Sequence, residues 1–159
     1  MRIFIFFLCF FCLSAEAFAS TTISIAETQS LTFPTLGIPT AGTASLAISP
    51  LNSSTSGTAQ IISGIASRGA YTLSSQGSGG VSISVDISVT DSGGTGLTLD
   101  TFRGFYNSTT INSFPSTTLS VPAKKPATTP LYLGATITAN TSVSPGSYTG
   151  YFTITVFVQ

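Results

Sequence analysis

The sequence predicts an all-β protein, an antiparallel β-sandwich of about seven to nine short strands. Segments in which apolar and polar residues alternate recur roughly every 10 to 15 residues, and clusters of Gly, Pro, Asn and Ser separate them. Residues that favour pleated, half-buried surfaces, such as Thr, Val, Ile, Phe and Tyr, are abundant. No segment shows the period of an amphipathic helix.

In the first half of the chain, the expected strands are short and turn-forming residues separate them. Ile23 and Ile25 alternate with polar residues in a first strand, and Leu31 and Phe33 follow as a second extended pair. The remaining strands of this half are expected at residues 44–48, 61–65 and 71–73.

The second half contains the clearest two-residue period of the chain. At residues 81–89, Val and Ile alternate with Ser, Asp and Thr, and Gly-rich turns at 76–80 and 91–96 flank this strand. Further strands are expected at residues 97–102, 119–121, 131–139 and 150–158. Residues 105–130 are rich in Pro and Asn, so we expect long loops there around the short strand at 119–121.

The final segment alternates up to the last residues of the sequence. Successive side chains of a strand point to opposite faces, so every second residue shares a face. One face holds Gly150, Phe152, Ile154, Val156 and Val158, and the other holds Tyr151, Thr153, Thr155 and Phe157. This pattern predicts that the C-terminal strand belongs to the core or to an interface.

Residues 1–19 are expected to form a cleaved signal peptide. Arg2 precedes an apolar run from Ile3 to Leu13 that is too short for a transmembrane helix. Ala17 and Ala19 fit the small-x-small cleavage pattern, which places the mature start near Ser20. An uncleaved membrane anchor is the alternative. We therefore expect an exported protein, in the periplasm, at the cell surface or outside the cell, with one domain over residues 20–159 and no membrane span.

Both cysteines, Cys9 and Cys12, lie within this expected leader. The mature chain would therefore contain no disulfide although its compartment permits them. Its stability must come from its core.

The composition argues against catalysis and against polyanionic partners. Only 6 % of the residues are charged, the formal net charge is zero, and there is no His. A neutral surface does not attract nucleic acid or anionic lipid, and it is poorly protected against self-association. Without His or mature Cys, the common nucleophile–base pairs cannot form, so we expect neither an enzyme nor a cofactor. Asp86, Asp91 and Asp100 are interpreted as turn and surface residues rather than as acid–base groups or calcium ligands.

Several segments resemble a bacterial domain family of unknown function, number 4402. They are Leu31 to Phe33, Gly42 to Ala44, Ile48 to Pro50, Ala59 to Leu73, Leu97 to Phe102, Leu131 to Ile137, Pro145 to Gly150 and the terminal strand. The resemblance spans nearly the whole mature chain and implies an exported, immunoglobulin-like sandwich with a surface or fimbrial role. The Gly-x-Tyr-x-Gly turn before the last strand also resembles the ends of spore-coat-U type and chaperone–usher pilus subunits, many of which carry a disulfide that is absent here.

The first functional hypothesis is an adhesive or structural subunit of a surface fibre that associates by β-strand addition. Residues 20–27 are the candidate donor strand, through Ile23 and Ile25. The strand with Phe152, Ile154, Val156 and Val158 would line the acceptor groove and pair with a periplasmic chaperone. The expected partners are copies of the chain, other fibre subunits and that chaperone, with no nucleic acid. The alternative is that residues 22–26 pair within their own chain as an ordinary edge strand.

The second hypothesis is a self-contained secreted module that binds a carbohydrate or a protein. Long loops on a rigid sandwich are common binding sites, so the loops of residues 105–130 would form it. Exposed Tyr106 and Asn107 would favour this function. The two hypotheses differ in whether a strand of the same chain covers the edge beside residues 152–158.

Overall fold

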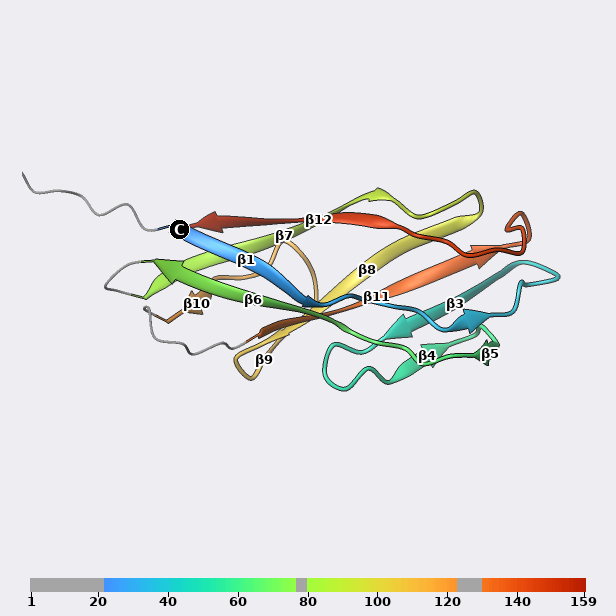
Figure 1. Ribbon diagram of the computed structural model, residues 1–159, viewed down its shortest axis with the longest axis horizontal. Helices are drawn as coiled ribbons and strands as arrows, with labels where there is room; N and C mark the ends of the chain where they lie inside the picture. Colours follow the sequence, from blue (N-terminus) through green and yellow to red (C-terminus); the bar gives the residue numbers. More distant parts are fainter. Residues whose placement is uncertain (1–21, 77–79, 123–129) are drawn as a thin grey trace, which may run out of the picture.

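The computed structural model describes residues 22–76, 80–122 and 130–159. The expected signal peptide, residues 1–19, lies outside these residues. Within the described part of the chain there are twelve strands and no helix, so no helix is present there that could cross a membrane. The prediction of an all-β sandwich is confirmed (Figure 1).

Seven strands have six or more residues and form the body of the fold. These are β1 (Thr22–Gln29), β3 (Thr43–Ile48), β6 (Gly69–Gln76), β7 (Val81–Asp91), β8 (Leu97–Tyr106), β11 (Pro130–Asn140) and β12 (Tyr151–Val158). Five others have only two or three residues. They are β2 (Thr35–Leu36), β4 (Thr55–Gly57), β5 (Ile61–Ser63), β9 (Thr109–Ile111) and β10 (Leu119–Val121).

The larger sheet is built around β11. One side of β11 pairs with β8, and the other side pairs first with β6 and then with β3. β1 continues this sheet beyond β6, β4 continues it beyond β3, and β9 continues it beyond β8. All these pairs are antiparallel.

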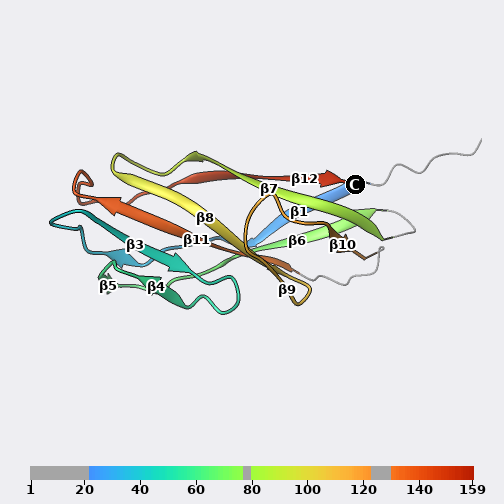
Figure 2. The same ribbon diagram turned by 180° about the vertical axis from the view of Figure 1, so that it is seen from behind.

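The smaller sheet has the order β10-β7-β12 (Figure 2). β12 pairs with β7 from Tyr151 opposite Asp91 to Val158 opposite Ile83. β7 also pairs with the short β10, and a separate two-stranded sheet joins β2 to β5. The alternation predicted for residues 81–89 therefore lies on the central strand of its sheet.

The core lies between the two sheets and is unevenly filled. In the described part of the chain, eleven buried residues form one cluster, which is centred on Ile83 and Val85 of β7 and on Leu131 and Leu133 of β11. The cluster at the other end has only three buried residues, Leu99, Phe102 and Ala135, with Leu31 and Phe33 half-covering it. One end of the sandwich is therefore much better filled than the other.

Phe152 connects the two sheets across this core. Its ring lies 5.0 Å from the ring of Phe102 in β8 and 6.4 Å, edge to face, from the ring of Tyr71 in β6. Aromatic rings at such separations attract one another beyond the effect of burial alone. Phe152 thus holds β12 to the opposite sheet.

The segment from 105 to 130 is more regular than expected. Tyr106 ends β8, and β9 returns alongside it, so part of the expected loop is a hairpin. Beyond it, the N–H of Ser116 donates to the carbonyl oxygen of Val85 at 2.7 Å, while the N–H of Val85 donates to Ser116 Oγ at 2.9 Å. The prediction of loops was wrong at residues 109–111, which form β9, whereas residues 112–118 have no strand and the short strand expected at 119–121 is β10.

Substituting Gly134 tests how closely β3 and β11 approach each other. A Cβ at this position would lie 1.9 Å from the carbonyl oxygen of Ile48, so a backbone segment has to move. We expect Gly134→Ala to lower the free energy of unfolding by about 2–4 kcal/mol in a denaturant titration. Gly37→Ala is the matched control, because its nearest contacts are at 3.6 Å, and it should change stability by no more than about 0.5 kcal/mol. Equal effects would contradict the close approach.

Candidate functional site

The candidate site is the outer edge of β12. Among the residues that the structure describes, β12 pairs with β7 alone, which leaves the other side of an eight-residue strand unpaired. The sequence of the strand, YFTITVFV, contains no Pro and no charged residue. Pro and charges are two common means by which proteins keep an edge strand from pairing with other chains. The edge therefore lacks these two protections.

The hydrogen bonds of β7 show which backbone groups of β12 face this edge. The N–H of Gln159 donates to the carbonyl oxygen of Ser82 at 2.9 Å, so these two facing residues are a hydrogen-bonded pair. Val85 uses its N–H and carbonyl oxygen toward Ser116, on the side away from β12. In an antiparallel ladder, hydrogen-bonded and non-hydrogen-bonded pairs alternate. The backbone groups that point to the open edge are thus those of residues 152, 154, 156 and 158.

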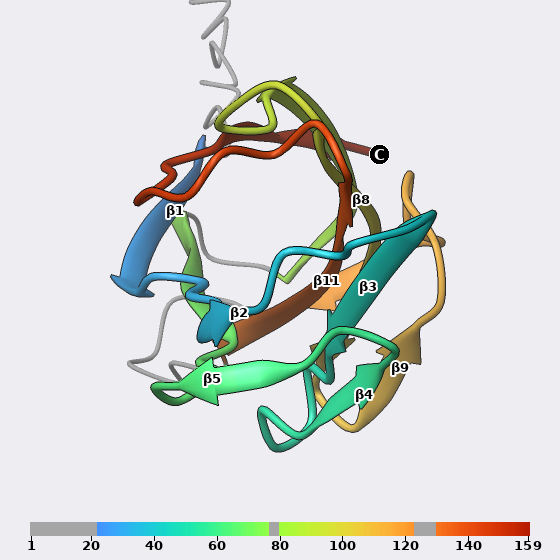
Figure 3. The same cartoon turned by 90° about the vertical axis from the view of Figure 1, so that its right-hand side faces the viewer.

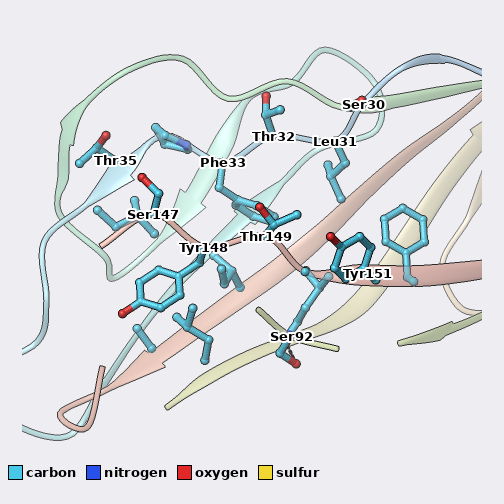
Figure 4. A pocket seen from close by; sticks show the side chains of 18 of the residues that line it. Ser30, Leu31, Thr32, Phe33, Thr35, Ser92, Ser147, Tyr148, Thr149 and Tyr151 are labelled. Carbon is cyan, nitrogen blue, oxygen red and sulfur yellow. Dashed lines mark hydrogen bonds between the residues drawn. The ribbon is translucent and has the colours of Figure 1, made fainter. Parts of the chain in front are cut away.

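An apolar groove opens beside the first half of β12. It has a volume of about 1050 Å³ and lies between the segment that follows β1 and the segment that leads into β12. Viewed along the long axis, these two segments lie on opposite sides of the open end (Figure 3). Leu31 and Phe33 line one side, while Tyr148 and Thr149 line the other (Figure 4).

The groove exposes the poorly filled end of the core. Leu99 from β8 and Ile137 from β11 belong to its lining, as do Phe152 and Ile154 from β12. Hydroxyl groups of Ser and Thr surround these apolar side chains, and among the described residues of the lining Glu27 is the one that is charged. Such a surface suits an uncharged, largely apolar occupant.

Two glycines allow the segment before β12 to lie close against the turn at residues 91–96. A Cβ at Gly94 would lie 2.7 Å from the ring of Tyr148, and one at Gly93 would lie 3.0 Å from the backbone of Thr149. Gly93 also has φ 94°, a conformation that other residues rarely adopt. The hydroxyl of Tyr148 donates to the carbonyl oxygen of Ser144. The Gly-x-Tyr-x-Gly sequence and the turn at residues 91–96 therefore fix one wall of the groove together.

Tyr71 gives the groove a pH-sensitive residue. Burial raises the pKa of the Tyr71 phenol to about 12, and the negative charge of Glu27, its cross-strand neighbour, contributes a smaller part. Burial also raises the pKa of the Tyr106 phenol. Both rings are therefore neutral over the physiological range.

The structure places the expected donor residues in their own chain. Ile23 and Ile25 lie on β1, which pairs with β6 from Thr22 opposite Gln76 onward. This is the intrachain pairing that we considered as the alternative. Both side chains pack against the same core cluster as Ile154 and Val156. Ile25 and Glu27 also line the groove, so the open volume begins beside the second half of β1.

The expected acceptor residues divide between the groove and the core. Phe152 and Ile154 line the groove, and Val156 packs against the larger core cluster. Val158 is 54 % exposed and Phe157 is 51 % exposed, so the end of β12 presents apolar side chains to solvent. The alternation predicted for this strand is visible in its burial, because residues 152, 154 and 156 are half-buried and their neighbours are exposed.

The structure places the two residues of the alternative loop site, Tyr106 and Asn107, at the end of β8 and in the turn that follows it. Tyr106 is only 2 % exposed, and its hydroxyl lies 3.5 Å from the carbonyl oxygen of Ser120. Asn107 is exposed in the tight turn between β8 and β9, with φ 45°. Exposure of both residues was the condition that would favour the second hypothesis, and Tyr106 does not meet it because it faces the core at the end of its strand.

The three aspartates make local contacts. Asp91 accepts a hydrogen bond from the N–H of Gly93, Asp86 accepts one from the N–H of Ile87, and Asp100 accepts one from the hydroxyl of Thr101. In the described ranges, no three His, Cys, Asp or Glu residues are grouped so that they could hold a metal ion.

The comparisons with known proteins give one match. A family model described as Domain of unknown function (DUF4402) matches residues 23–157, a range that includes the groove and nearly all of β12. No curated protein and no solved structure matches the chain. The resemblance seen in the sequence segments is thereby confirmed.

The raised pKa of Tyr71 predicts a loss of stability at high pH. Below about pH 10 the phenol is neutral in both states, and between about pH 10 and 12 it ionises in the unfolded chain before it does so in the folded protein. The free energy of unfolding should therefore fall across that interval. The fall should be smaller in Tyr71→Phe than in Tyr151→Phe, whose ring is exposed. Denaturant titrations at about pH 9 and pH 11.5 measure the difference, and parallel losses in both variants would contradict the assignment.

Proposed function

The chain belongs to the DUF4402 family, and we propose that it is an exported structural subunit of a surface fibre that associates by addition of a β-strand to β12. In this mechanism an extended segment of a neighbouring subunit pairs with the open edge. Backbone hydrogen bonds give such a contact its affinity, and pockets for alternate side chains give it its specificity.

The observation that carries this proposal is the open edge of β12 beside the groove. Residues 152, 154, 156 and 158 direct their backbone groups outward, and Phe152 and Ile154 also line the groove. A strand that pairs with this edge would therefore also place every second side chain over the groove. β12 therefore provides both contacts that strand addition requires, the backbone edge and the side-chain groove.

The uneven core supports the same mechanism. The end of the sandwich beside the groove has three buried residues in its cluster, and Leu31 and Phe33 remain half-buried there. Burying apolar surface contributes about 25 cal/mol per Å², so an added strand with apolar side chains at this end is stabilised by filling it. The groove can thus be described as the place of a missing strand.

β1 of a neighbouring copy is our candidate donor. Only Ile23 and Ile25 of its eight residues are half-buried, and the other six are exposed. An edge strand that is held by so few side chains can leave its own sheet at low cost and pair with β12 of another copy, much as strands leave their own chain in domain swapping. Ile23 and Ile25 alternate as an inserted strand requires.

The leader-like residues 1–19 and the low content of charged residues support an exported, polymerising subunit. The apolar run and the small-x-small pattern are typical of secretion, and the expected compartment is the periplasm or cell surface. A surface with few charges opposes association only weakly.

Blocking the β12 edge tests the proposal in cells that export the full chain. Ile154→Pro removes an N–H that points to the open edge and leaves the hydrogen bonds to β7 in place. Thr155→Lys adds a charge to the same edge strand. We expect each to lower the yield of isolated fibres by at least about tenfold, equivalent to about 1.4 kcal/mol.

Ser88→Lys is the matched control for both edge variants. Ser88 is exposed on the inner strand β7, opposite Thr153, so the charge is added one strand away from the edge. This variant should form fibres at the normal yield. Normal yields from Ile154→Pro and Thr155→Lys, with circular dichroism showing a folded domain, would refute strand addition at β12.

Mixing two complementary variants tests whether β1 is the donor. Ile154→Pro keeps its donor and lacks an edge, whereas a chain without residues 20–26 keeps its edge and lacks a donor. We expect neither variant to polymerise alone and the mixture to form a one-to-one complex, measured by light scattering. If the deletion variant still polymerises alone, β1 is not the donor.

A further inference from the structure

We propose that in a free subunit, whose β12 edge no donor strand occupies, this edge is paired with β12 of a second copy, in a two-fold symmetric antiparallel pair. This inference rests on the open edge used in the proposed function, and it assigns a different occupant to that edge. The pair would join the two small sheets into one sheet of order β10-β7-β12-β12-β7-β10.

The outward backbone groups fix the register of this pair. They belong to residues 152, 154, 156 and 158, and an antiparallel pair forms hydrogen bonds only between residues that both point to the partner. A two-fold axis at Thr155 places 152 opposite 158 and 154 opposite 156. All four outward residues of each copy then have a partner, and moving the axis by one residue leaves some of them without one.

The side chains are compatible with this register. On the solvent face, Thr155 lies opposite Thr155 of the second copy, and Thr153 lies opposite Phe157. On the inner face, Phe152 lies opposite Val158. No residue of β12 is charged, so the symmetry brings no like charges together. Cross-strand pairs of β-branched and aromatic residues are among those that stabilise sheets.

The two ends of β12 complement each other in shape. At its C-terminal end Phe157 and Val158 are about half exposed, and at its beginning Phe152 borders the open groove. The antiparallel register brings Val158 of each copy, on the inner face, beside Phe152 and the groove of the other copy, whereas Phe157 stays on the solvent face. Each copy thus covers part of the apolar surface at the other copy's groove, and the two-fold symmetry repeats this contact.

The symmetric pair does not extend into a fibre. An isologous contact uses the same surface of both copies and is closed after two. It would protect the edge of a free subunit from other strands, and it competes directly with a donor strand for the same backbone groups. If a strand of another protein occupies the edge instead, the following test will reveal it.

Cysteine crosslinking measures the register directly. In the full chain with Cys9→Ser and Cys12→Ser, Thr155→Cys places two thiols across the axis, where facing Cα atoms of a non-hydrogen-bonded pair lie about 4.5 Å apart. This separation permits a disulfide. Thr153→Cys is the matched control on the same face, because its two copies would be four residues apart along the strand, about 13 to 14 Å.

We expect mild oxidation of the purified, exported protein to convert Thr155→Cys into a disulfide-linked dimer, with at least about tenfold less dimer from Thr153→Cys. Light scattering of the unpolymerised fraction of the unsubstituted protein should show a concentration-dependent dimer. Equal crosslinking of both variants, absence of crosslinking in either, or copurification of another protein on the edge would each overturn the symmetric pair.

The edge variants separate this inference from the proposed function. If Thr155→Cys crosslinks and Ile154→Pro still forms fibres, the symmetric pair stands and the fibre mechanism fails. If Ile154→Pro abolishes fibres and Thr155→Cys does not crosslink, the fibre mechanism stands and the symmetric pair fails.

Discussion

The contact of Phe152 with both sheets determines the position of β12 and of everything beside it. On its own sheet β12 has only β7 as a neighbour among the described residues, and Phe152 adds the rings of Tyr71 and Phe102 from the opposite sheet. Because these contacts in the core hold β12 in place, the strand does not need a second neighbour on its outer side. Its backbone groups can therefore remain unpaired while the sandwich stays folded, which is the condition for an edge that accepts another strand.

The uneven core follows from the same arrangement. At one end, side chains from β7 and β11 are fully buried, and β1 adds Ile23 and Ile25. At the other end the second half of β1 and residues 30–38 border the groove, and in the described chain no strand fills the space between them and β12. The groove is thus the space that such a strand would occupy. The surface left open there is apolar, and covering it is favourable for any strand that fits.

The sequence predicted the strands in which apolar and polar residues alternate strongly. It did not predict the features that depend on which strands pair with each other. For β7, β11 and β12 the period of two showed which side chains face the core, and these strands were predicted nearly at their observed limits. A period shows the buried face but not the neighbouring strand. It therefore could not show that β1 pairs with β6, or that the residues before β12 form a groove wall. It also could not show that Tyr106 is buried, because the Pro-rich and Asn-rich sequence that follows concealed the end of β8.

The two proposed occupants of β12 exclude each other, and their contacts differ in kind. A second copy of β12 pairs with all four outward residues but brings only the exposed end of a strand to the groove. A donor strand between β1 and β12 would pair with the same residues and also lay its side chains along the length of the groove. Burial of additional apolar surface favours the donor strand. The symmetric pair is therefore the weaker contact, as a reversible cover for the edge must be if fibre growth is to replace it.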